Sequence, residues 1–255
     1  MSVINLKDKK DISLLGIDKS VSFVISENDK ASIFIDGLSD NNELNFDVKD
    51  GAYLHVSFLA DKPVKNLKIL ANVGQNAEIM VHFADFSTDE NTANVVINLN
   101  KENARATWHL ASLASEKDNK HISVSVFHNS PLTFARVDNY GVAKEESKLV
   151  FSGTSHILNG SIKSKTEQNA KIMVFDPKSD AIAKPILKID ENDIEASHAA
   201  AVGKINDEHL FYLTSRGLSV EDARSLITLG YLKPIFKGFD DDKVERINAL
   251  IGGRL

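Results

Sequence analysis

The sequence contains no cysteine among its 255 residues. Disulfide bonds are therefore excluded, and the chain cannot build a metal site from its own thiolates. A chain of this length buries a large core without such cross-links, either as one extended domain or as two compact ones. The lack of cysteine also fits a reducing compartment.

Two features that place a protein at a membrane or on nucleic acid are absent as well. No apolar run reaches the length of a membrane span, and the opening MSVINLKDKKD lacks the apolar core of a signal peptide. The 30 basic and 36 acidic residues are interspersed and give a net charge of −6, so the sequence shows no basic stripe of the kind that binds a phosphate backbone. We therefore expect a cytoplasmic protein that binds neither nucleic acid nor membrane.

The residue patterns of a self-contained active site are also missing. No glycine-rich loop ends in Lys-Ser or Lys-Thr to hold nucleotide phosphates, and neither Ser152-Gly153 nor Gly37-Leu38-Ser39 forms a nucleophile elbow. The adjacent carboxylates Glu145 and Glu146 lie in a polar stretch between apolar runs. We predict that the chain is not an enzyme.

The sequence does contain a succession of short apolar runs between Val21 and Val150. Runs such as VSFVI, LNFDV, YLHVSF, EIMVHF and ISVSV are rich in β-branched or aromatic residues, and polar turns separate them. After Asn206 the apolar residues instead recur every three or four positions, which predicts helices. We place the change near His198.

An alanine that ends several of the turns marks a weak internal repeat. The first four copies lie 21, 25 and 27 residues apart (31 to 52, 52 to 77 and 77 to 104). Positions two and four after each alanine are apolar in every copy, which predicts that even offsets point inward. Coils of a parallel β-helix fit this repeat, but an antiparallel sandwich alternates in the same way, so periodicity leaves both open. The five alanines are Ala31, Ala52, Ala77, Ala104 and Ala170.

Capping residues predict three helices in the last part of the chain. Asn206 is a suitable N-cap for a helix that ends at Gly217, and Ser219 caps a second helix that ends at Gly230. A third helix is expected from Asp241. We thus predict a strand-rich domain over residues 1–205 and a helical domain over residues 206–255.

Three stretches near the end of the chain carry a family resemblance. SHAAAVGKI from Ser197, LFYLTSRGLS from Leu210 and ARSLITLGYLKPIF from Ala223 are similar to the C-terminal signature of the SufB/SufD family, scaffold subunits of the SUF iron–sulfur cluster assembly machine. The run FSGTSHILNGSIKSKTEQNAKIMV from Phe151 also resembles that family. The details match the SufD branch, although family members usually carry glycine where this chain has Ala199.

The resemblance implies both a fold and a role. The fold would be a right-handed parallel β-helix followed by a small helical domain, and the sequence leaves no room for the family's usual N-terminal helical domain. The role would be that of a non-catalytic scaffold that pairs with a SufB-like paralogue and docks a SufC-like ATPase at its C-terminal helices. Two alternatives stay open: a structural β-helix that self-associates, for example as a homodimer, and a carbohydrate-active β-helix enzyme.

His198 is the candidate metal ligand. Small residues follow it, so either a ligand approaches the ring closely or the ring is buried and hydrogen-bonded to backbone. The resemblance implies the first, since the family places a histidine here that faces a cysteine of the SufB paralogue, where a nascent cluster forms. The chain would then bind no stable cofactor alone and would share a transient iron–sulfur cluster with its partner.

Three other histidines, His55, His82 and His109, are spaced 27 residues apart (55 to 82 and 82 to 109). Their odd offsets from the repeat alanines place them on the outer face, and we predict that they are solvated surface residues without a carboxylate partner. The apolar residues of the helical part exceed what short helices can bury against one another, so we predict that they bind the ATPase. These residues are Leu226, Ile227, Leu229, Tyr231, Leu232, Ile235 and Phe236.

Overall fold

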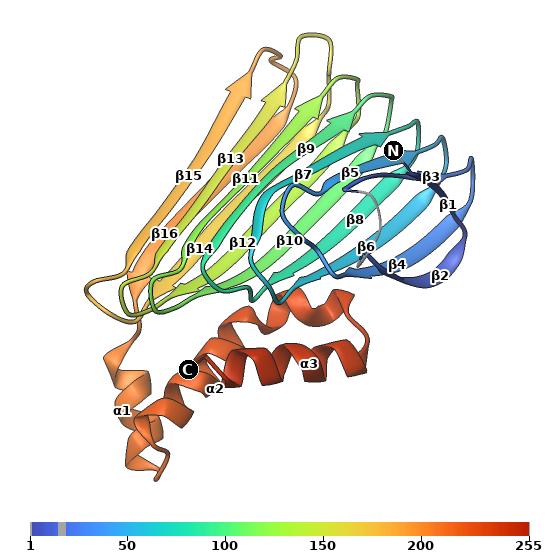
Figure 1. Cartoon of the computed structure of the whole chain (residues 1–255). Helices are drawn as coiled ribbons and strands as arrows, with labels where there is room; N and C mark the ends of the chain where they lie inside the picture. The colour runs from blue at the N-terminus through green and yellow to red at the C-terminus, as the bar shows by residue number, and fades with distance from the viewer. Residues whose placement is uncertain (1, 15–18, 255) are drawn as a thin grey trace.

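The computed structural model describes residues 2–14 and 19–254 and contains two parallel sheets of eight strands each (Figure 1). The side chain of residue 9 lies outside the description. The first sheet consists of β1 (Ser2–Leu6), β3 (Ser20–Ile25), β5 (Glu43–Val48), β7 (Val64–Val73), β9 (Glu90–Leu99), β11 (Asn119–His128), β13 (Lys148–Ile157) and β15 (Asp180–Ile189). The second consists of β2 (Asp8–Ser13), β4 (Lys30–Asp36), β6 (Tyr53–Ala60), β8 (Glu78–Asp85), β10 (Arg105–Ala114), β12 (Phe134–Ala143), β14 (Lys165–Val174) and β16 (Glu195–Lys204).

Each strand pairs with the strand two places later in the chain, and every pairing is parallel. Successive strands therefore alternate between the two sheets, and each pair of strands completes one coil that stacks on the coil before it. The protein is a parallel β-helix followed by C-terminal helices, as the resemblance implied, and the antiparallel sandwich is excluded.

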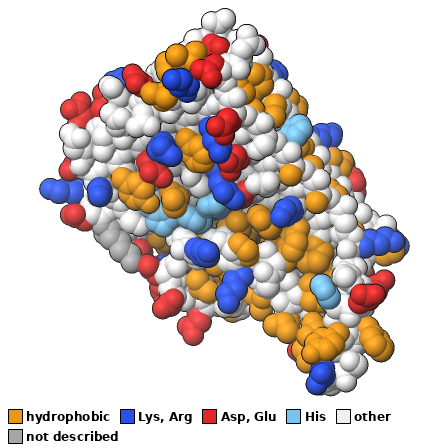
Figure 2. Space-filling view, turned by 180° about the vertical axis from the view of Figure 1, so that it is seen from behind, with side chains coloured by type: hydrophobic (Ala, Val, Ile, Leu, Met, Phe, Trp, Pro, Cys, Tyr) orange, Lys and Arg blue, Asp and Glu red, His pale blue; other side chains and the backbone are white. Residues whose placement is uncertain are grey.

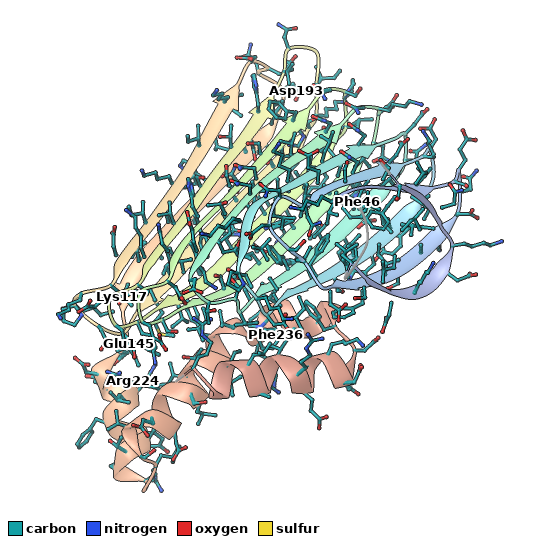
Figure 3. The ribbon with its side chains drawn as sticks, viewed as in Figure 1. Phe46, Lys117, Glu145, Asp193, Arg224 and Phe236 are labelled. Carbon is teal, nitrogen blue, oxygen red and sulfur yellow. The ribbon has the colours of Figure 1, made fainter. Side chains whose placement is uncertain are left out.

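Large side chains stack along the inside of the β-helix, one coil on the next. The ring of Phe46 lies 5.0 Å from that of Phe23 and 6.0 Å from that of Phe58, and Phe83 continues the stack to Trp108 at 6.1 Å (Figure 3). All five are fully buried. The predicted inward direction of even offsets is thus confirmed, because residues such as Ile33, Leu54, Ile79 and Ala106 all belong to this core.

The fifth copy of the alanine repeat was aligned wrongly. Ala170 lies inside β14, whereas the residue in register with the turn residue Ala104 is Ser164, six positions earlier. Six is an even number, so the predicted inward direction of Ala170 and Ile172 is still correct. The position of the turn, unlike the face of the strand, could not be taken from the alanine alone.

The predicted boundary near His198 was also wrong, because His198 lies within the last strand, β16. The change from strand to helix falls between Lys204 and Asp207. β16 escaped prediction because EASHAAAVGK is rich in alanine, which has little preference for strands. Parallel pairing with β14 along the whole strand overrides that weak preference.

The helical part comprises α1 (Asp207–Ser215), α2 (Val220–Leu232), the 3₁₀ helix η1 (Lys233–Gly238) and α3 (Asp241–Gly252). The predicted caps are confirmed: Asn206 Oδ1 accepts from the backbone of Glu208 at 2.8 Å, and Ser219 Oγ accepts from Asp222 at 3.0 Å. Gly217 has a φ of +95°, which suits a glycine after a helix. Gly230 does not end α2, which continues to Leu232. No helix in the described ranges is long and apolar enough to cross a membrane.

The helices return along the turns that follow the strands of the second sheet, so that α3 lies under the first coils and α1 under the last (Figure 1). A second apolar cluster fixes them there. It joins Leu59, Ala84, Phe86 and Leu113 of the β-helix to Leu232, Ile235, Phe236, Phe239, Ile247 and Ile251 of the helices. Figure 3 places Phe236 in this layer between ribbon and helices.

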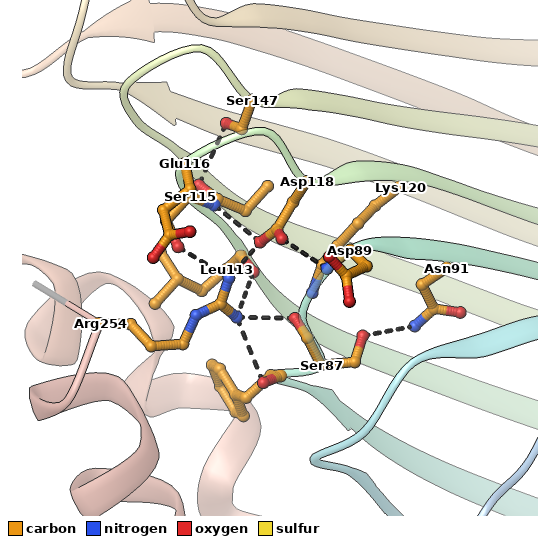
Figure 4. Close-up of polar contacts among 12 residues, drawn as sticks. Ser87, Asp89, Asn91, Leu113, Ser115, Glu116, Asp118, Lys120, Ser147 and Arg254 are labelled. Atoms are coloured by element: carbon orange, nitrogen blue, oxygen red, sulfur yellow. Dashed lines mark hydrogen bonds and ion pairs between the residues drawn. The ribbon is translucent and has the colours of Figure 1, made fainter.

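Arginines of the helical part reinforce this docking. Arg254 Nη1 donates to the carbonyls of Ser87 at 2.7 Å and Leu113 at 3.2 Å, and Nη2 contacts Ser115 and Asp118 (Figure 4). Arg246 reaches Asp36 at 3.2 Å and also contacts Asp61. These carboxylates lie on one edge of the β-helix, at or beyond the ends of β4, β6 and β10, so the docking surface is acidic where the helices bring positive charge.

Candidate functional site

The last coil, formed by β15 and β16, leaves one end of the β-helix open. All ten residues of β16 are exposed, whereas β14, its neighbour in the sheet, alternates between buried and half-buried side chains. Within the described part of the chain no further strand covers this coil. Its core-facing side and the outer edge of β16 are therefore available to another molecule.

His198 lies near the middle of this uncovered strand, on its inward-facing side. It is in register with Gln168 of β14, which is in register with Val137 of β12 and, through it, with the core residue Trp108 of β10. The first three positions of this row are buried and His198 is exposed. The row places the imidazole on the core-facing side of β16, and no further coil among the described residues covers it.

The surroundings of His198 are small or polar. Ala196 and Ala200 occupy the inward positions on either side of it. Beneath it, Gln168 Nε2 donates to Ser155 Oγ at 2.6 Å and to the carbonyl of Ile186 at 3.3 Å, so that side chain is already satisfied. The ring is thus exposed rather than buried.

Apolar side chains flank the histidine on the same open end. Val202 of β16 is 46% exposed, and Ile186 and Ile189 of β15 are exposed as well. Val202 shares the inward-facing side with His198. An exposed imidazole among small and apolar residues on an edge strand is typical of a surface that another chain covers.

Comparison with known proteins identifies the family. A model of the family described as "SUF system FeS cluster assembly, SufBD core domain" matches residues 14–231, which is most of the β-helix together with α1 and nearly all of α2. The chain belongs to the SufB/SufD family.

Individual relatives match over shorter stretches. The iron–sulfur cluster assembly protein SufD of Bacillus subtilis is 33% identical over 116 residues, which are 46% of this chain and 26% of the relative. SufD of Escherichia coli is 28% identical over 165 residues, 64% of this chain and 38% of the relative. SufB of Bacillus subtilis is 27% identical over 153 residues, 60% of this chain and 33% of the relative. The matched stretches thus span about a third of the length of these SufB/SufD-family proteins.

The residues predicted to bind an ATPase separate into two groups in this SufB/SufD-family chain. Leu232, Ile235 and Phe236 are buried against the second sheet and hold the helices in place. Ile227, Leu229 and Tyr231 are half-buried, and Leu226 is 51% exposed. Only the second group reaches the molecular surface, and most of its members do so in part.

Further exposed aromatic residues lie on α1, which has no buried residue at all. Phe211 is 74% exposed and Tyr212 is 57% exposed, and apolar side chains gather at the tip of the helical part at the lower right of Figure 2. Neither residue belongs to the set predicted to bind the ATPase. The turn at Gly217 separates α1 from the helices that dock, which leaves both side chains exposed.

The prediction of three solvated histidines was wrong for His82, which is only 4% exposed. The segment around Gly238 covers it, and His55 and His109 are half-buried beside it. His109 also has a carboxylate partner, since its Nδ1 lies 3.3 Å from Asp138. That partner comes from β12, the next strand in the sheet, and could not be recognised before the register between strands was known.

Among the residues that the structure describes, no three histidine, aspartate or glutamate side chains are arranged to hold a metal ion. His198 therefore brings a single imidazole to the open end of this SufB/SufD-family chain.

Proposed function

We propose that this protein is a non-catalytic, cytoplasmic scaffold subunit of a SUF-type complex. Through the open end of its β-helix it pairs with a SufB-like paralogue, and through its C-terminal helices it docks a SufC-like ATPase. The observation that carries the proposal is the position of His198, which lies on the core-facing row of a coil that no other coil in the described part of the chain covers. Membership of the SufB/SufD family and relatives named as iron–sulfur cluster assembly proteins support it.

The chemistry of the chain supports a shared site. Without cysteine it supplies no thiolate, so the imidazole of His198 adds one nitrogen ligand to groups from the paralogue. A neutral imidazole binds iron without first losing a proton near pH 7. The iron–sulfur cluster is then cargo assembled between subunits, and this chain holds no stable cofactor alone.

The first test compares His198→Ala with Ser197→Ala, a matched control on the opposite face of the same exposed strand. Each variant is co-expressed with the paralogue and the ATPase, and iron and acid-labile sulfide are measured in the purified complex. We expect His198→Ala to lose several-fold in cluster content while Ser197→Ala loses none.

Melting temperature is measured beside cluster content in both variants. Both positions are exposed, so each change should alter stability by less than about 0.5 kcal/mol. Equal cluster content in the two variants would contradict the role of His198, and a large loss of melting temperature in His198→Ala would assign it a structural role instead.

A further inference from the structure

Three imidazole rings form a continuous stack on the outer face of the second sheet. His55 Nδ1 lies 3.0 Å from Ser32 Oγ, and His55 Nε2 lies 3.1 Å from His82 Nδ1. The rings of His82 and His109 are 4.8 Å apart, and His109 Nδ1 lies 3.3 Å from Asp138. We call His55, His82 and His109 the histidine stack; a band of histidines is visible in pale blue in Figure 2.

The end of η1 lies directly on this stack. A Cβ atom added to Gly238 would come within 2.1 Å of the His82 ring, so only glycine permits this approach. Ser57 Oγ donates to the carbonyl of Gly238 at 2.5 Å, and Phe239 meets His82 edge-on with ring centroids 6.4 Å apart. The stack is therefore part of the surface on which the C-terminal helices dock.

Few negative charges face the stack. Asp138 is the nearest carboxylate, and it already accepts from Arg136 Nε at 2.7 Å and from Asn169 at 2.8 Å. Around His55 a cavity of about 130 Å³ brings in Asp11, Asp240 and Lys243, of which Asp11 and Lys243 pair with each other at 2.9 Å.

A second cavity, of about 360 Å³, lies beside His82 and His109. Lys237 of η1 lines both cavities, and Arg136 and Asp138, which pair with each other, line the second. A proton on His82 would meet its two neighbouring rings and would be enclosed under Gly238 and Phe239.

We infer that the histidine stack is a proton-sensitive latch: while its rings are neutral it helps to hold η1 and α3 against the β-helix, and protonation of His82 weakens that docking. The two cavities give protons access to the stack from both sides while the helices remain docked.

The pKa of His82 in the docked state sets the direction in which docking depends on pH. Burial, together with the neighbouring His109 and His55, lowers the pKa of His82 from its ordinary 6.5 to about 3. Burial alone would raise the pKa of Asp138, but the adjacent His109 ring and hydrogen bonds from Asn169 and Arg136 hold it at about 2, so Asp138 stays charged throughout. Docking is thus undiminished above pH 6.5 and weakens about tenfold per pH unit as the pH falls from 6.5 toward 3.

Hydrogen exchange of the full chain followed by mass spectrometry measures this release. Exchange of residues 233–254, corrected for the intrinsic effect of pH, is compared at pH 7.5 and 5.5 with that of β9 in the core. We expect about tenfold faster exchange in residues 233–254 at pH 5.5, with no comparable change in β9. His82→Gln should largely abolish this pH dependence, whereas His121→Gln, on the exposed face of the first sheet, should retain it.

A second variant tests the latch if His82→Gln fails to fold. Gly238→Ala pushes a methyl group into the His82 ring and should accelerate exchange of residues 233–254 at both pH values. Gly252→Ala has no atom within 4 Å of the new methyl and serves as its control. The latch is refuted if the wild-type pH response of residues 233–254 equals that of β9, if His82→Gln keeps the full response, or if Gly238→Ala exchanges like Gly252→Ala.

Discussion

Gly141 occupies an inward-facing position of β12, where the absence of a side chain leaves room for Leu149 and Phe151. A Cβ atom at this position would lie 2.5 Å from Leu149 Cδ2 and 2.8 Å from Phe151 Cζ. Phe151 belongs to the buried core, so neither neighbour can move aside without disturbing the packing of the next coil.

We therefore expect Gly141→Ala to destabilise the protein by about 1–3 kcal/mol through overpacking, measured by urea unfolding. Gly203→Ala is the matched control, because no atom lies within 4 Å of the added methyl in β16. The account of the core would be wrong if the two substitutions had the same effect on the free energy of unfolding.

The alanine repeat has its physical basis in single residues of the turns. Asn76 and Asn103, which precede Ala77 and Ala104, have φ values of +52° and +58°, a conformation that asparagine tolerates better than most residues. Asn103 Nδ2 donates to Asn76 Oδ1 at 2.9 Å, so the turns of adjacent coils also bond to one another. At Ala77 and Ala104 the sequence therefore predicts both the position of the turn and the inward-facing side of the strand that follows it.

At the scale of elements, prediction succeeded where a side-chain pattern decides the structure and failed where a contact across the chain decides it. The caps at Asn206 and Ser219 are local and were predicted correctly. β16 exists because it pairs with β14, and His82 is buried because Gly238, far along the chain, lies on it. Neither contact has a signal within the segment itself.

The α1–α2 hairpin is the element that we expect to capture the ATPase. Its exposed Leu226 should be required, so Leu226→Asp should reduce capture of the SufC-like subunit at least about tenfold by placing a charge in an apolar contact. Capture is measured by pull-down with the purified ATPase, and circular dichroism confirms that the variant is folded.

The control for this experiment is Ile162→Asp, a similarly exposed apolar residue in a turn on the β-helix. That turn belongs to the edge that also carries Asp193, away from the helices in Figure 3. If both variants captured the ATPase equally well, the docking site would have to lie outside the hairpin.

Over the whole molecule, the open end of the β-helix and the edge that carries the helices differ in the side chains that they present. The helical edge is closed by an apolar cluster and by arginines bound to aspartates of the turns. The open end presents a strand of small residues with one histidine on its inner face. This division suits a scaffold that joins a paralogue at one surface and an ATPase at another, which is the central claim.

The most direct test of that claim is the composition of the complex formed with the SufB-like paralogue, measured by size-exclusion chromatography with light scattering. The account predicts a one-to-one complex that Ala200→Glu, on the inner face of β16 beside His198, weakens at least about tenfold, while Ala199→Glu on the outer face leaves it largely intact. An equal effect of the two substitutions, or a homodimer that persists when the paralogue is in excess, would contradict it.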